Sequence, residues 1–252
     1  MKPRTPADQP DRRLGVLAFG DSITNGGGEL QWGVALQSWA LWVSRALGLP
    51  YTGYAVDGAR ASDLVAAQIP ALARLGAYPD ARYEVGCLYV GVNDVRALDW
   101  DVGRFERDYA EALRFLAARC DRTLALTIPL GLGIPPAGAK VGQANAVIER
   151  LSGDHGALTV DLTRFGARNQ VMADRVHPTA FGQVAIAERA LAVLAGDGLP
   201  TRVAPAALIA FKTTRWGRLR GDLTYVYRSA KQCGRAAAQR RRVNRRSDRT
   251  PQ

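Results

Sequence analysis

Cysteine is scarce in this sequence of 252 residues. The three cysteines are Cys87, Cys120 and Cys233, an odd number at spacings of 33 and 113 positions. Such spacing fits neither a disulfide framework nor a set of zinc ligands. We therefore expect reduced thiols in a cytoplasmic protein.

Long apolar runs and nucleotide-binding motifs are missing as well. No apolar run reaches the roughly 18 residues of a membrane span, and the first 20 residues lack the hydrophobic stretch of a signal peptide. The sequence has no Walker-type glycine-lysine loop, no GxGxxG fingerprint and no cluster of metal ligands. These absences predict a protein that is not exported and that uses no cofactor or metal ion.

Acidic residues are few only in the C-terminal part of the chain. The formal net charge is +11, but residues 201–252 hold 14 Lys and Arg and two Asp. Residues 1–200 therefore contain 20 basic and 21 acidic residues, a net charge of −1. The basicity does not indicate the partner of the main domain, and nucleic acid is not its expected ligand.

Short apolar segments alternate with amphipathic ones. Runs rich in β-forming residues predict buried strands at 14–20, 51–56, 83–90, 122–128 and 157–162. Apolar residues at helical spacing predict helices at 32–47, at 62–75 after a Ser62 cap, and at 104–119, 141–152 and 180–195. This alternation predicts an α/β protein with five parallel strands between two helical layers.

Unusual polar residues follow the predicted strands. They are Gly20-Asp21-Ser22 after the first strand, residues 57–60 after the second, residues 91–94 after the third, and residues 174–178 in the loop after the fifth. The carboxyl ends of parallel strands form one edge of the sheet, where ligands bind in this class of fold. We therefore expect a functional site at that edge.

This edge contains the groups that acyl transfer requires. Ser22 is the candidate nucleophile, and His177 is the candidate base because the other histidine, His155, is predicted at the opposite edge. Asp174 precedes His177 by three residues and can fold back onto its Nδ1 atom. Asp161, near the end of the fifth predicted strand, is the alternative partner for the imidazole.

Hydrogen-bond donors for a developing oxyanion are available at the same edge. The candidates are the backbone N–H groups of Ser22 and Gly58 and the side-chain amide of Asn93. Asp21 and Asp94 are interpreted as structural residues that anchor their loops. Losing a side-chain donor such as Asn93 would reduce kcat by roughly 10² to 10³.

At these residues the sequence resembles the SGNH (GDSL-type) hydrolase family. The matching motifs are GDSIT at 20–24, a glycine at position 58, GVND at 91–94 and DRVHP at 174–178, in the family's order. The segment around Gly58, AVDGARAS, lacks the asparagine that often precedes this glycine in the family. The resemblance implies a flavodoxin-like three-layer α/β/α sandwich with a five-stranded parallel sheet. It also implies a catalytic triad of Ser22, Asp174 and His177 and an oxyanion hole of Ser22, Gly58 and Asn93.

Three tryptophans and one arginine have alternative interpretations. Trp32 lies nearest the glycine-rich loop and is a candidate for the acyl pocket, whereas Trp39 and Trp42 are expected in the core or the wall of a groove. Arg60 is either a solvated residue or a contact for an anionic substrate group.

The predicted function is a serine esterase or lipase-like hydrolase of small or medium acyl esters. An acyltransferase with the same triad remains open, because motifs do not report which acceptor the pocket admits. A second class of function is a non-catalytic protein on this fold that docks to membrane or nucleic acid. We favour the enzyme, because every triad and oxyanion residue is present, and we expect a monomer.

The C-terminal region has a composition of its own. We divide the chain into an N-terminal tail (1–13), a catalytic domain (14–198), a basic amphipathic helical extension (199–238) and a disordered basic tail (239–252). Apolar residues from Trp216 onward recur at helical spacing among arginines. Such a helix packs on its own domain, contacts an anionic membrane at its inner, cytoplasmic face, or binds nucleic acid.

Overall fold

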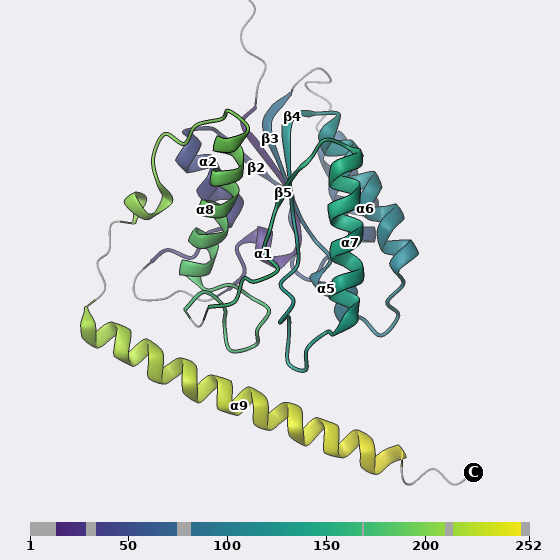
Figure 1. Ribbon diagram of the computed structural model, residues 1–252, viewed down its shortest axis with the longest axis vertical. Coiled ribbons are helices and arrows are strands. Elements are labelled where there is room, and N and C mark those ends of the chain that lie inside the picture. The colour runs from purple at the N-terminus through teal and green to yellow at the C-terminus, as the bar shows by residue number, and fades with distance from the viewer. Residues whose placement is uncertain (1–13, 29–33, 75–81, 168, 210–213, 248–252) are drawn as a thin grey trace, which may run out of the picture.

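A computed structural model describes residues 14–28, 34–74, 82–167, 169–209 and 214–247 (Figure 1). Its centre is a parallel sheet in the order β2-β1-β3-β4-β5. The strands are β1 (Val16–Gly20), β2 (Tyr51–Gly53), β3 (Tyr83–Tyr89), β4 (Cys120–Leu126) and β5 (Leu158–Val160). All five lie within the predicted segments or within two residues of them, and the predicted α/β class with five parallel strands is confirmed.

Helices cover both faces of this sheet. Helices α2 (Trp39–Leu47) and α8 (Ala180–Gly196) lie side by side on one face, and α6 (Val102–Ala117) and α7 (Ala139–Asp154) pair on the other (Figure 1). Residues 16–19 of β1 are completely buried, as expected for a strand covered on both faces. The molecule is the predicted three-layer α/β/α sandwich.

The first predicted helix begins later than expected. Helix α2 starts at Trp39, because the Ser38 side chain caps it by accepting a hydrogen bond from Ala40 N. The backbone N–H of Trp39 donates to Gln183 Oε1 at 2.8 Å. The part of the predicted helix between Val34 and Ser38 is therefore not helical.

The predicted helix at 62–75 consists of three short pieces. They are α3 (Ala61–Asp63), a π-helical segment η2 (Leu64–Gln68) and α4 (Ile69–Ala73). Ser62 does not cap this helix as predicted. The cap position is Arg60, whose backbone N–H donates to the Asp63 carboxylate at 2.8 Å.

Two short helices at the carboxyl edge were not predicted. They are α1 (Ser22–Asn25) after β1 and α5 (Val92–Arg96) after β3. Both are too short to carry an apolar periodicity, so the sequence pattern could not reveal them. They place Ser22 and Asn93 on ordered backbone.

The C-terminal region contains a short 3₁₀ helix, η3 (Pro205–Leu208), and one long helix, α9 (Arg215–Ser247). Arg202 N and Val203 N both donate to Ala46 O, which ties the start of this region to α2. Helix α9 includes residues 239–247, which the sequence analysis placed in the disordered basic tail. Arginine, glutamine and alanine favour a helix, and the next proline is Pro251. Residues 248–252 and the predicted tail 1–13 lie outside the described residues.

Candidate active site

Ser22 follows a turn that only glycine fits well. Gly20 has φ of 155°, and a Cβ atom on it would lie 2.3 Å from Tyr89 O. Its backbone N–H and carbonyl are both held by the buried Gln68 side chain, at 3.1 and 2.8 Å. Asp21 then caps α1 by accepting from Ile23 N at 2.9 Å. These contacts fix the backbone from which the Ser22 side chain projects.

Ser22, His177 and Asp174 form a continuous chain of hydrogen bonds. Ser22 Oγ lies 3.0 Å from His177 Nε2, and His177 Nδ1 lies 2.7 Å from Asp174 Oδ2. The other Asp174 oxygen, Oδ1, accepts from Val176 N and His177 N. Because the carboxylate faces Nδ1, it favours the imidazole tautomer with the proton on Nδ1, which leaves Nε2 free to accept from the serine.

Backbone geometry brings Asp174 back onto His177. Arg175, between them in sequence, has φ of 55°, the one positive φ at a non-glycine residue in the part of the chain that the structure describes. Strained conformations of this kind occur at functional sites, where the surrounding structure holds them. The three-residue spacing that predicted this contact is thus realised through a left-handed turn.

The two titratable members of the chain shift each other's pKa. Burial would raise the pKa of Asp174, but hydrogen bonds from His177 and from the Val176 and His177 backbone lower it below 3.8. The hydrogen bond to Asp174 raises the pKa of His177 above 6.5, against the opposing effect of burial. The pair therefore favours an ionised carboxylate beside an imidazole of increased basicity.

Two carboxyl groups near the site, the buried Asp21 and the half-buried Asp94, have raised pKa values. Burial raises the pKa of Asp21 to about 7, and its Oδ2 atom has no hydrogen-bond partner among the described residues. Burial raises the pKa of Asp94 to about 6, although both of its oxygens accept from Ala61 N at 3.2 Å. Asp21 and Asp94 anchor α1 and the start of α3, the structural roles expected for them.

The helices that carry Ser22 and Asn93 are both tied to the turn that contains Gly58. Asn93 Nδ2 donates to Ala59 O at 3.0 Å, and Asn25 Nδ2 donates to Asp57 Oδ1 at 2.9 Å. Both bonds hold the turn that contains Gly58, which is exposed and has φ of 79°. Within the described ranges, the backbone N–H groups of Ser22 and Gly58 have no acceptor.

The alternative interpretations can be compared with these contacts. Asp161 accepts from Thr163 N and Oγ1 and does not contact His177, which pairs with Asp174 instead. Arg60 forms a 3.1 Å ion pair with Asp99. Trp39 and Trp42 are buried in the core as expected, and Trp32 lies outside the described residues.

A cavity that the sequence did not predict adjoins the histidine loop. Its volume is about 450 Å³, and it is lined by the chain neighbours of the site, Ile23, Val176 and Pro178, but not by Ser22, Asp174 or His177. The wall also includes the loops after β4 and β5, Tyr89 of β3, Ile186 of α8 and Tyr225 of α9. It lies beside the candidate triad, and no single motif could have revealed it because its walls come from distant segments.

No metal site is built from the described residues, where His, Cys, Asp and Glu side chains nowhere group in threes. Within the same ranges, no helix has the length and hydropathy of a membrane span.

The three-layer α/β/α sandwich gathers Ser22, Asp174 and His177 at the carboxyl edge of its sheet, the arrangement expected of a serine hydrolase. The chain belongs to the GDSL-like Lipase/Acylhydrolase family, whose sequence model matches residues 18–185. It is therefore a carboxylic ester hydrolase, and the resemblance found in the motifs is confirmed. Comparison with curated proteins found no match.

Solved structures share the fold. One is an alpha/beta hydrolase enzyme from the metagenome of Lake Arreo, Spain, with a TM-score of 0.55 and 22% identity, over 74% of this chain and 98% of that one. Another is an acetylxylan esterase from Geobacillus stearothermophilus, with a TM-score of 0.53 and 19% identity, over 72% and 96%. An extracellular lipase from Streptomyces rimosus has a TM-score of 0.52 and 19% identity, over 73% and 99%.

Proposed function

We propose that this esterase cleaves small or medium acyl esters through an acyl-enzyme on Ser22, with His177 and Asp174 as the other triad members. The observation that carries the proposal is the hydrogen-bond chain from Ser22 Oγ to His177 Nε2 at 3.0 Å and from His177 Nδ1 to Asp174 Oδ2 at 2.7 Å. The acetylxylan esterase and the lipase among the structural neighbours support ester substrates.

In the first half of the reaction, Ser22 Oγ attacks the ester carbonyl carbon while His177 Nε2 takes the hydroxyl proton. Asp174 stabilises the imidazolium, and the N–H groups of Ser22, Gly58 and Asn93 donate to the oxyanion. Collapse of the tetrahedral intermediate expels the alcohol, which takes its proton from Nε2. The acyl group stays on Ser22.

In the second half, a water molecule attacks the acyl carbon and gives its proton to His177. Collapse of this intermediate releases the carboxylic acid, and the proton returns to Ser22 Oγ. Metal and cofactor have no part in the proposed steps.

A fluorophosphonate probe tests the nucleophile directly. We expect wild-type protein to be labelled once, on the tryptic peptide that contains Ser22, and to hydrolyse p-nitrophenyl esters from C2 to C12. Labelling without hydrolysis would instead support an acyltransferase with a specific acceptor. A protein that is not labelled and does not hydrolyse any of these esters would refute the proposed triad.

The pH dependence of kcat/KM follows from the histidine. Catalysis needs neutral His177, whose pKa is raised above 6.5, while Asp174 stays ionised because its pKa is lowered. Activity is therefore expected to rise with pH, with its acidic half-maximum above pH 6.5. Initial rates on p-nitrophenyl acetate between pH 5 and 9 measure this, after correction for spontaneous hydrolysis. A half-maximum near the ordinary carboxyl pKa of about 4 would contradict a histidine base.

Replacing Asn93 by alanine is expected to reduce kcat by roughly 10² to 10³ with little change in KM, because the lost donor acts in the transition state. The variant also loses the bond to Ala59 O, so the loop is loosened. Asn25→Ala is the matched control: it loses a similar bond, to Asp57, without removing a proposed donor. Equal losses in the two variants would show that Asn93 only holds the loop.

A further inference from the structure

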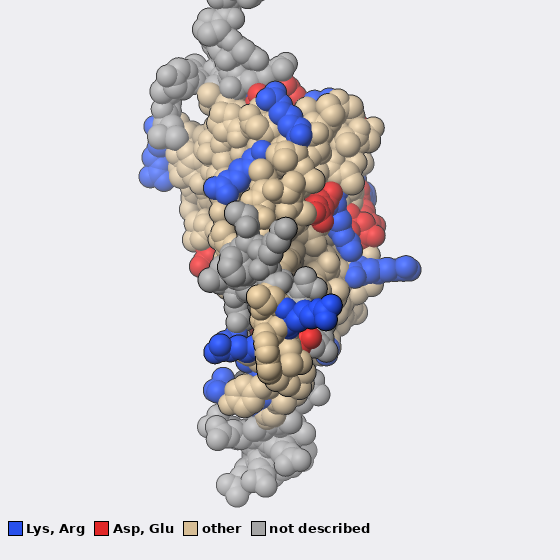
Figure 2. Space-filling model, turned by 90° about the vertical axis from the view of Figure 1, so that its left-hand side faces the viewer, with Lys and Arg blue, Asp and Glu red and all other residues tan. Residues whose placement is uncertain are grey.

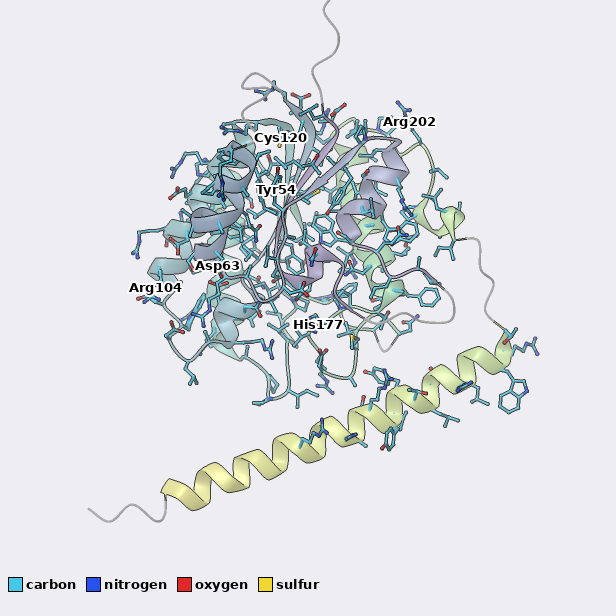
Figure 3. All side chains as sticks on the ribbon, turned by 180° about the vertical axis from the view of Figure 1, so that it is seen from behind. Tyr54, Asp63, Arg104, Cys120, His177 and Arg202 are labelled. Atoms are coloured by element: carbon cyan, nitrogen blue, oxygen red, sulfur yellow. The ribbon has the colours of Figure 1, made fainter. Side chains whose placement is uncertain are left out.

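Helix α9 crosses the molecule beneath the carboxyl ends of the strands (Figure 1). Figure 3 places His177 on the side of the domain that faces this helix. Tyr225 of α9 lines the cavity beside the histidine loop. The long C-terminal helix therefore lies at the same edge of the molecule as the candidate active site.

The face of α9 turned toward the domain is mostly small and polar. Its partly buried positions are Gly217, Gly221, Asp222, Thr224, Tyr225 and Ser229. At 100° per residue these positions occupy one side of the helix. Apart from Tyr225 they offer little apolar surface, so hydrophobic packing on the domain does not explain the amphipathic sequence.

The apolar residues of α9 instead face solvent. The exposed fractions are 77% for Trp216, 49% for Leu219, 63% for Leu223, 54% for Val226 and 66% for Tyr227. On the helical projection they form one continuous stripe, opposite the face that lies on the domain. We call these five residues the α9 stripe. Contiguous exposed apolar surface of this kind marks an interaction site.

Basic residues border the α9 stripe. Arg215 lies along one side of it, and Arg220 and Lys231 lie along the other, all three exposed. Figure 2 shows blue Lys and Arg atoms next to tan uncharged ones at the end of the molecule where α9 begins. Between residues 215 and 235 the sequence contains one acidic residue, Asp222, on the partly buried side. The outward surface thus combines apolar side chains with positive charge.

We propose that the α9 stripe and its basic borders dock this enzyme on an anionic lipid bilayer, with the catalytic edge turned toward the membrane. Apolar residues enter the interface, tryptophan and tyrosine prefer that depth, and Lys and Arg meet anionic headgroups. Nucleic acid would require the charges but not the apolar stripe. Two copies pairing through α9 would bring like charges together. The proposal goes beyond the ester chemistry, and its test does not depend on turnover.

The test uses the full-length protein and sedimentation with sucrose-loaded vesicles. One set contains phosphatidylcholine alone and the other contains phosphatidylcholine with phosphatidylglycerol. We expect at least about ten-fold stronger partitioning to the anionic set, weakening as salt rises from 0.1 to 0.5 M. Absence of binding to anionic vesicles, or equal binding to both sets, would overturn the proposal.

Paired variants separate the two parts of the surface. Leu219→Gln with Leu223→Gln, and Arg220→Gln with Lys231→Gln, should each reduce partitioning at least about ten-fold. The control for the leucine pair is Leu98→Gln, an exposed leucine outside α9, and the control for the basic pair is Arg107→Gln with Arg114→Gln on α6. Vesicle partitioning of both controls should stay within about two-fold of the wild type. Hydrolysis of soluble p-nitrophenyl acetate checks that each variant is folded.

Other partners of the α9 stripe would give different experimental results. A dimer in light scattering that dissociates in the leucine double variant would assign the stripe to a second copy of the chain. A DNA or RNA mobility shift that the Arg220 and Lys231 changes abolish, without vesicle binding, would assign it to nucleic acid. Either result would overturn the proposal. Loss of esterase activity with intact vesicle binding would refute the reaction and leave the docking surface standing.

Discussion

Replacing Ser22 by alanine is expected to reduce kcat for p-nitrophenyl acetate by roughly 10⁴ to 10⁶, to the level of residual catalysis from binding and oxyanion contacts. The reason is that Oγ forms the covalent bond to the acyl group in the proposed reaction, and no other described side chain takes its place beside His177 Nε2. Labelling by a fluorophosphonate should disappear together with turnover.

Structural damage is not an expected cause of this loss. The cap of α1 comes from the Asp21 side chain, and the turn is held by Gln68, so neither contact involves the serine hydroxyl. The thermal midpoint of Ser22→Ala should therefore stay close to that of the wild type. Ser62→Ala, at another serine on the same edge, is the matched control and should retain labelling and turnover. If Ser22→Ala kept more than about one-hundredth of the wild-type kcat, the proposed acyl-enzyme would be wrong.

The sheet could be predicted because burial on both faces leaves a clear trace in sequence. Strands such as β1 are continuous apolar runs, and the rule that ligands bind at the carboxyl ends of parallel strands predicts Ser22, Asn93 and His177 at one edge of the sheet. The contact between Asp174 and His177 was also predictable, since three residues of chain span it.

Features that depend on distant contacts could not be predicted in this way. The start of α2 is set partly by Gln183, which is 144 residues away in sequence. The cavity is walled by segments from Ile23 to Tyr225, each unremarkable alone. The direction of the α9 stripe is a similar case: periodicity identifies an apolar face, but whether that face meets the domain or solvent depends on where the whole helix lies.

The roles of the carboxylates can be separated by changing Asp174 to asparagine, which is expected to reduce kcat by roughly 10³ to 10⁴. An asparagine amide donates to Nδ1 and so favours the proton on Nε2, the atom that must accept from Ser22. The pH profile should change as well. Because the hydrogen bond to Asp174 is the largest cause of the raised His177 pKa, the residual activity should have its acidic half-maximum at a lower pH than in the wild type.

The decisive comparison for this prediction is Asp161→Asn, because Asp161 was the other carboxylate that the sequence offered as a partner for His177. Its oxygen accepts from Thr163 N and Thr163 Oγ1 at 2.7 and 2.6 Å, so that variant should lose a local turn contact and keep kcat within about three-fold of the wild type. Steady-state rates from pH 5 to 9 on both variants and the wild type distinguish the two roles. If Asp161→Asn had the larger effect, or if Asp174→Asn left the pH profile unmoved, then the 2.7 Å contact between Asp174 and His177 would serve only to hold the loop. A large kcat loss with a displaced half-maximum in Asp174→Asn alone would establish that this carboxylate sets both the tautomer and the basicity of the histidine.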